Sequence, residues 1–196
     1  MKILFGTYRL KNNEVKCIER ALQIGYEGID CASIYNNEKD IGKVLTNFNI
    51  QDNDVRKKYW IQTKIWRSVK KEKAISTLKK SLKYLNINYV DCWLIHWPGP
   101  GRHLAFPPII TKNGEKVINL NPKVATIPID WKPEDRLKIY KEMCKAIDLG
   151  LTKSLGVCNF SPQLLNQLLE FCKKESLPYP HIVQNEFHPF LNNKDL

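Results

Sequence analysis

The sequence predicts an α/β protein with parallel strands, and the alternation of its apolar segments is the main reason. Short apolar runs alternate with helical patterns along all 196 residues, as in chains whose parallel strands are joined by right-handed crossovers. Hydrophobic residues make up 43% and charged residues 26% of the chain, which is the balance of a globular protein. This length suits one domain with a sizeable core, so we expect residues 1–196 to form a single domain.

Six segments show the strand pattern, and helical patterns lie between them. The predicted strands are Ile3–Gly6, Gly28–Cys31, Tyr59–Thr63, Tyr89–Ile95, Lys153–Gly156 and Ile182–Glu186. Apolar residues at three- and four-residue steps predict four helices. The first contains Val15, Ile18 and Leu22, and the second contains Ile41, Val44 and Leu45. The third contains Ile75, Leu78, Leu82 and Leu85, and the fourth contains Leu137, Tyr140, Cys144 and Ile147. A fifth helix is expected to begin at Ser161-Pro162, a capping residue followed by proline at the first helical position.

Two architectures fit this alternation, an open doubly wound sheet and a (β/α)8 barrel. The open sheet is disfavoured because the dinucleotide-binding pattern G-x-G-x-x-G does not follow the first strand. One segment, residues 98–133, breaks the rhythm with proline, glycine and polar residues and little periodicity. It is longer than a normal connection between a strand and a helix, so we expect a long loop at the mouth of the barrel.

The formal charge of +11 raises the question of an anionic partner such as nucleic acid. The basic residues are spread along the chain and do not interleave with aromatic residues as an RNA-binding sheet requires. A general bias toward lysine and asparagine explains the charge more simply. We therefore expect no nucleic-acid partner.

The sequence lacks the patterns that would indicate membrane insertion, secretion or a metal site. It has no run of eighteen apolar residues and no signal-peptide pattern at its start, so we expect a cytoplasmic protein without membrane contact. The six cysteines form no C-x-x-C pair and no cluster at zinc spacing. We expect them to be reduced and mostly buried, and no metal site is predicted.

Polar side chains recur at or just beyond the ends of the predicted strands. Asp30 ends the second strand and Tyr35 follows it, Lys64 ends the third, His96 ends the fourth, and Cys158 and Asn159 end the fifth, with Gln184 in the sixth. In a parallel barrel these ends meet on one face, which is where active sites are found. Taken singly, each residue has an ordinary explanation, such as a solvated lysine, a capping aspartate or a core histidine. Taken together, they favour a site.

Five segments identify the family that this chain resembles. They are GYEGIDCASIYNNEKDIG, TKIW, LIHWP, GVCNFS and QNEFHP, which are similar in order and spacing to the landmarks of the aldo-keto reductases. The resemblance covers essentially the whole chain. It implies a (β/α)8 barrel, here truncated after about six strands, and the reduction of small aldehydes or ketones by hydride transfer from NADPH.

The resemblance also implies the roles of the catalytic residues. Tyr35 would be the general acid that protonates the developing alkoxide, helped by the neighbouring cation of Lys64. Asp30 would pair with Lys64 and keep it charged. His96 would donate a hydrogen bond to the substrate oxygen and orient it.

The remaining site residues implied by the resemblance serve the cofactor and the substrate. The cofactor contacts would be Thr7, Asp30, Cys158, Asn159 and Gln184, with the two amides holding the nicotinamide carboxamide. The substrate pocket would be lined by Tyr8, Trp66, His96 and Trp97, with Phe106 from the long segment. The family usually has serine where this chain has Cys158, and a thiol is the weaker hydrogen-bond donor.

The motifs stop before the seventh and eighth strands of the family's barrel. The aromatic residue that stacks on the nicotinamide, the pocket for the adenosine 2′-phosphate and the substrate-selecting loop belong to that missing part. Six strands cannot close an eight-stranded barrel, so the first and sixth strands would have open edges through which chains could self-associate. We expect this chain to bind NADPH more weakly than a complete reductase. A cofactor-sensing subunit on the same fold, or an inactive fragment, stays open as an alternative.

Overall fold

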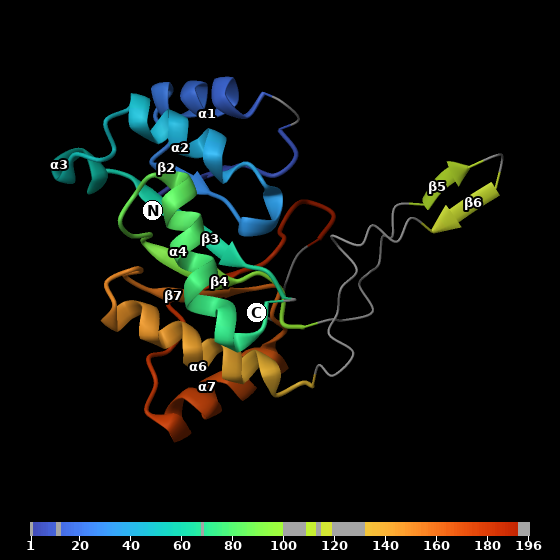
Figure 1. The fold of residues 1–196 in the computed structure, drawn as a ribbon. Coiled ribbons are helices and arrows are strands. Elements are labelled where there is room, and N and C mark those ends of the chain that lie inside the picture. The colour runs from blue at the N-terminus through green and yellow to red at the C-terminus, as the bar shows by residue number, and fades with distance from the viewer. Residues whose placement is uncertain are drawn as a thin grey trace.

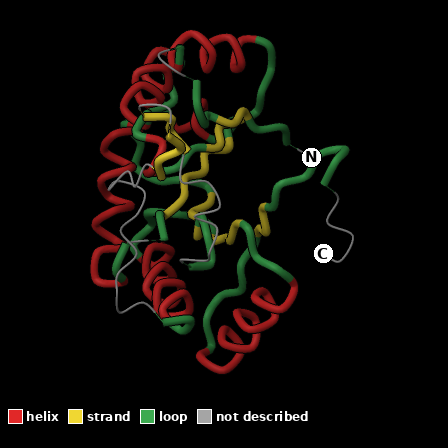
Figure 2. Tube along the Cα trace, turned by 90° about the vertical axis from the view of Figure 1, so that its right-hand side faces the viewer, coloured by secondary structure: helices red, strands yellow, loops and turns green. Residues whose placement is uncertain are grey.

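A six-stranded parallel sheet forms the centre of the structure, a computed structural model that describes residues 2–10, 13–67, 69–99, 109–112, 115–118 and 132–191. The strand order is β1-β2-β3-β4-β7-β8, so neighbours in this sheet follow one another along the chain. The strands are β1 (Phe5–Gly6), β2 (Gly28–Asp30), β3 (Trp60–Ile65), β4 (Cys92–Ile95), β7 (Leu155–Cys158) and β8 (Ile182–Gln184). Figure 2 shows them as an arc around an open centre.

The helices cover the outer, convex side of this arc (Figures 1 and 2). They are α1 (Glu14–Gln23), α2 (Glu38–Asn47), α3 (Asn53–Arg56), α4 (Ala74–Leu85), α6 (Asp135–Asp148) and α7 (Pro162–Glu175). A doubly wound sheet would carry helices on both faces, so that alternative is wrong. The single winding direction and the curl confirm a (β/α)8-type barrel truncated after six strands.

The core lies between the convex face of the sheet and the helices. Trp93, Tyr140 and Phe160 are its largest fully buried side chains, and they belong to one cluster that extends from α1 to α7. A second, smaller cluster of Cys92, Leu94 and Cys158 lies apart from it. Because side chains alternate across a strand, β4 can contribute Trp93 to one cluster and Leu94 to the other.

The predicted elements are confirmed, with shifts at their boundaries. All six strands are present, although β3 runs to Ile65 and so contains Lys64 instead of ending at it. The five predicted helices are present, and Ser161 caps α7 by accepting a hydrogen bond from the Leu164 N–H. The four-residue helix α3, which the Asp52 carboxylate caps, was not predicted because it is too short to show periodicity.

The long segment 98–133 contains secondary structure that the sequence did not predict. Ile109–Lys112 (β5) and Glu115–Ile118 (β6) pair as an antiparallel two-stranded sheet. Most of the segment, including Phe106, lies outside the described residues, so the predicted place of a loop at the barrel mouth stays a prediction.

The described residues bear on membrane insertion and on metal binding. No helix among them is long and apolar enough to cross a bilayer. Within the same ranges, no three or more histidine, cysteine, aspartate or glutamate side chains gather as metal ligands would.

Candidate active site

A buried ion pair joins the carboxyl ends of β2 and β3. The Lys64 ammonium binds the Asp30 carboxylate and also donates to the Cys31 carbonyl oxygen at 3.1 Å. The Lys64 side chain is only 3% exposed, and a lysine at that depth requires such a partner. The two strands are neighbours in register, so the sheet itself brings this pair together.

Tyr35 reaches the same place from the short 3-10 turn η1 (Ser33–Tyr35) that follows β2. Asn36 ends the turn with a left-handed φ of 59°, which asparagine tolerates better than most residues. The Ser33 hydroxyl donates to the Lys64 carbonyl oxygen at 3.0 Å, and this bond holds the turn against the end of β3.

The Tyr35 hydroxyl faces His96, which directly follows β4. Its oxygen lies 3.5 Å from His96 Nε2, and the Lys64 ammonium lies 5.6 Å from the centre of the Tyr35 ring. The four residues predicted to be catalytic, Asp30, Tyr35, Lys64 and His96, therefore come together at the carboxyl ends of β2, β3 and β4.

Burial changes the acidity of both hydrogen-bonding groups. It raises the pKa of Tyr35 above its usual value near 10, and the negative charge of Asp30 adds to this. It lowers the pKa of His96 to about 3, with a further contribution from the Lys64 cation. Tyr35 is thus a protonated phenol and His96 a neutral imidazole at ordinary pH.

The Asp30 carboxylate is also held by two glutamines, of which the sequence analysis identified only one. Gln62 in β3 donates from Nε2 to Asp30 Oδ1 at 2.8 Å and to Gln184 Oε1 at 3.2 Å. Gln184 donates from Nε2 to the other carboxylate oxygen at 3.2 Å. Gln62 lies two residues before Lys64, and this spacing, which puts both on one face of a strand, is the signal that could have revealed it.

The indole of Trp60 fixes which way the Gln62 amide points. Its Nε1–H donates to Gln62 Oε1 at 3.0 Å. An indole N–H can only donate, so the amide oxygen must face Trp60 and the amide nitrogen must face Asp30. The carboxylate consequently receives hydrogen bonds from Lys64, Gln62 and Gln184.

The predicted cofactor residues lie around the same carboxyl ends. Thr7 donates to the Asp30 carbonyl oxygen from its backbone N–H at 3.1 Å and from its hydroxyl at 3.0 Å. Asn159, at a left-handed φ of 61°, donates from Nδ2 to the His96 carbonyl oxygen at 2.8 Å. Burial raises the pKa of the Cys158 thiol to about 12, so the thiol keeps the proton it donates to Gln184 Oε1 at 3.3 Å.

Aromatic side chains flank Tyr35 and His96. The Tyr8 ring lies 4.9 Å from the Tyr35 ring, and the Trp66 ring lies 5.2 Å from the His96 ring. Tyr8 is 58% exposed, as suits a wall that a substrate would cover. Trp97 is partly buried and shares no ring contact with these side chains in the described part of the chain.

An open hollow of about 870 Å³ adjoins this cluster. It is lined by Lys2, Leu4, Gly6, Asp30, Trp60, Gln62, Ile182, Val183, Gln184 and Asn185. The Asn185 side-chain oxygen is buried without a hydrogen-bond partner in the described structure.

Comparison with known proteins places these features in a family. The sequence model of the Aldo/keto reductase family matches residues 2–196. The aldehyde reductase YPR1 of Saccharomyces cerevisiae is 33% identical over 98% of this chain and 58% of its own length. The NADP-dependent D-sorbitol-6-phosphate dehydrogenase of Malus domestica is 32% identical over 97% of this chain and 57% of its own.

Solved structures give the same answer for the fold. The aldose reductase of Schistosoma japonicum superposes with a TM-score of 0.72 at 30% identity, over 99% of this chain and 60% of that one. That of Giardia lamblia has a TM-score of 0.74 at 26% identity, over 98% of this chain and 59% of that one. The chain thus spans somewhat more than half the length of these relatives.

Proposed function

We propose, because the chain belongs to the aldo/keto reductase family, that its strand-end cluster serves the reduction of aldehydes or ketones to alcohols with NADPH. The observation that carries this proposal is the convergence of Tyr35, His96 and the Lys64–Asp30 pair at one edge of the sheet. Three separate strand ends contribute to it, which is the arrangement expected of a barrel active site.

Tyr35 is the proton donor in this proposal. Hydride arriving at a carbonyl carbon leaves an alkoxide on the oxygen, and an alkoxide is a stronger base than a phenolate. A tyrosine whose pKa is raised by burial therefore still gives up its proton to the product while remaining protonated beforehand. The buried Lys64–Asp30 ion pair lies next to the Tyr35 ring and helps to hold its position.

His96 orients the substrate. Because burial keeps its imidazole neutral, with a pKa of about 3, it can hydrogen-bond the carbonyl oxygen without placing a full charge there. Its Nε2 faces the Tyr35 hydroxyl at 3.5 Å, so an oxygen bound between them would contact both groups. The neighbouring Tyr8 and Trp66 rings, with Trp97, would form an aromatic wall that accepts many carbonyl compounds.

The residues around Gln184 fit a nicotinamide, and the NADP-dependent relative in Malus domestica favours NADPH. NADPH would supply the hydride. Asn159 Nδ2 donates a hydrogen bond to the His96 carbonyl oxygen, and its Oδ1 and second N–H would bind the carboxamide. Gln184 would exchange a bond to Gln62 or Asp30 for one to the cofactor. Thr7 and Cys158 would border the same site.

Replacing Tyr35 with Phe tests the proposal. It removes the proton and little else, so we expect turnover of a panel of aldehydes to fall by about 100-fold or more, while quenching of protein fluorescence by NADPH is retained. Tyr179→Phe is the matched control, because Tyr179 is 52% exposed and lies outside the cluster. Cofactor binding without turnover in the unaltered chain would favour a cofactor-sensing role, and neither binding nor turnover would favour an inactive fragment.

A further inference from the structure

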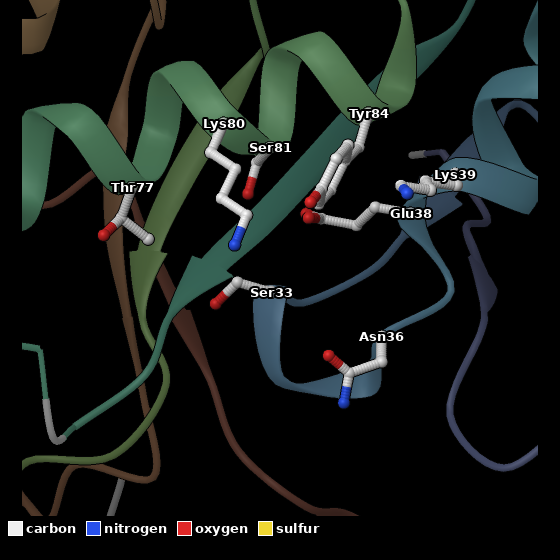
Figure 3. Close-up of a pocket in the computed structure, with 8 residues that line it drawn as sticks. All are labelled: Ser33, Asn36, Glu38, Lys39, Thr77, Lys80, Ser81 and Tyr84. Carbon is white, nitrogen blue, oxygen red and sulfur yellow. The ribbon is translucent and has the colours of Figure 1, made fainter.

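A second cavity lies on the helical side of the sheet, between α4 and the chain from Ser33 to Lys39 (Figure 3). Its volume is about 380 Å³, which is within the range of small-molecule sites. It is lined by Ser33, Asn36, Glu38, Lys39, Thr77, Lys80, Ser81 and Tyr84. None of the residues proposed to act in carbonyl reduction is among them.

Two ammonium groups border this cavity, and one of them, that of Lys80, interacts electrostatically with Glu38. The Lys39 and Lys80 nitrogens lie 4.9 and 5.5 Å from the centre of the Tyr84 ring. Neither forms a salt bridge in the described part of the chain, and Figure 3 shows Lys80 extending from α4 toward Ser33. A ring face compensates a cation only weakly compared with an anion, so both ammoniums are available to a ligand.

The one carboxyl group at the cavity does not neutralise them. Glu38 is 4% exposed and accepts a hydrogen bond from the Thr63 hydroxyl at 2.8 Å and another from Ser81. Burial raises the pKa of Glu38, whereas its hydrogen bonds with Thr63 and Ser81 and the positive charge of Lys80 lower it. Even as a carboxylate, Glu38 brings one negative charge against the two ammonium groups. The cavity is therefore positive on balance.

The hydroxyl groups of the cavity offer acceptors, because their protons are already used elsewhere. Ser33 donates to the Lys64 carbonyl oxygen at 3.0 Å and Thr77 to the Lys73 carbonyl oxygen at 2.8 Å. Ser81 is bound to Glu38. Their oxygens keep free lone pairs, so the wall around Lys80 is matched to hydroxyl groups on a ligand.

We propose that this cavity binds a small anion that carries hydroxyl groups, a phosphate ester or carboxylate of a hydroxylated carbon chain. The anionic group would bind the Lys80 ammonium, with Lys39 adding positive charge from beyond the Tyr84 ring, and the ligand hydroxyls would donate to Ser33 and Ser81. This inference does not depend on the proposed reductase activity. It has a link to that activity, however, because Ser33 belongs to the turn that carries Tyr35.

The test is an NMR titration of the ¹⁵N-labelled 196-residue chain with glycerol 3-phosphate, glycerate and inorganic phosphate at constant ionic strength. We expect saturable shifts at Asn36, Lys80 and Ser81, and tighter binding of at least one hydroxylated anion than of inorganic phosphate. Tighter binding of glycerol 3-phosphate would identify the anionic group as a phosphate ester, and tighter binding of glycerate would identify it as a carboxylate. The absence of saturable shifts at these residues, or equal affinity for inorganic phosphate, would overturn the proposal.

Paired lysine variants separate a built site from general attraction to a basic protein. Lys80→Ala and Lys79→Ala remove the same charge from the same helix, but Lys79 does not line the cavity. We expect Lys80→Ala to weaken binding by about tenfold or more and Lys79→Ala to leave it nearly unchanged. Equal weakening by both variants would mean that the anion is attracted by net charge alone, and the site would be rejected.

Discussion

His96 couples the site to the stability of the fold through its proton. The buried imidazole has a pKa of about 3, whereas a histidine in an unfolded chain titrates near 6.5. Above pH 6.5 the His96 side chain is neutral in both the folded and the unfolded state, so it contributes nothing to the pH dependence of the free energy of unfolding. Between pH 6.5 and 3 only the unfolded state binds the proton, so the free energy of unfolding is lost as pH falls.

This difference predicts a pH dependence that a non-titrating variant should lack. The wild-type free energy of unfolding should fall with decreasing pH more steeply than that of His96→Gln, by up to about 1.4 kcal/mol per pH unit between pH 4 and 6. Urea denaturation across this range measures it. The other histidines are present in both proteins and cancel, so parallel curves would show that His96 is accessible to protons in the folded state.

We expect the contributions of Gln62 and Trp60 to the free energy of unfolding to be coupled. In a double-mutant cycle of Gln62→Leu and Trp60→Phe, the coupling should be about 0.5–1.5 kcal/mol, because the indole N–H orients the amide. Gln62→Leu should cost more than Trp60→Phe, since Gln62 also holds Asp30 and Gln184. Chemical denaturation gives all four free energies. A coupling near zero would mean that the amide orientation does not depend on the indole.

At the level of elements, helices α2 and α4 approach each other at Gly42. A Cβ atom at Gly42 would lie 2.1 Å from the Tyr84 carbonyl oxygen, and backbone cannot move aside as a flexible side chain can. The absence of a side chain therefore permits this close packing. The same packing keeps α4 near Glu38, the first residue of α2, and so defines one wall of the cavity that is proposed to bind an anion.

We expect Gly42→Ala to destabilise the protein by about 1–3 kcal/mol, even though alanine is the better helix former. Gly6→Ala is the control, because no atom lies within 4 Å of a Cβ placed there. Thermal and urea unfolding of both variants test this. If Gly42→Ala were as stable as the control, the two helices would have to be free to separate.

The whole molecule is an arc with two open edges. Among the described residues, β1 pairs only with β2 and β8 only with β7. Exposed apolar side chains lie beside the β8 edge, namely Tyr179, Val183, Phe187, Phe190 and Leu191. Unpaired backbone groups beside exposed apolar surface favour association with another chain.

We therefore expect the 196-residue chain to self-associate as its concentration is raised. Sedimentation velocity should show species larger than a monomer, and the double variant Phe187→Lys, Phe190→Lys should reduce them, because it removes the two most exposed aromatic side chains of this group, at 76% and 97%. A single monomeric boundary at all concentrations would contradict the expectation.

The sequence by itself determined the six strands of the central sheet, five of the helices and the list of catalytic candidates. Apolar spacing is a local property, so Ile18 and Leu22 or Leu78 and Leu82 identify their helices without the rest of the chain. The position of Asp30, Lys64 and His96 at strand ends follows from the same pattern. Parallel strands then place those ends together, which is why their convergence could be predicted.

Only the tertiary structure decided the contacts that depend on distant segments. Gln62 and Gln184 are 122 residues apart in sequence, and no local pattern pairs two residues at that separation. The neutral state of His96 and the raised pKa of Tyr35 depend on burial, which many elements create together. The cavity at Lys80 likewise exists only because α4 packs beside the turn after β2. These are properties of how the elements pack, and packing is not encoded in any one of them.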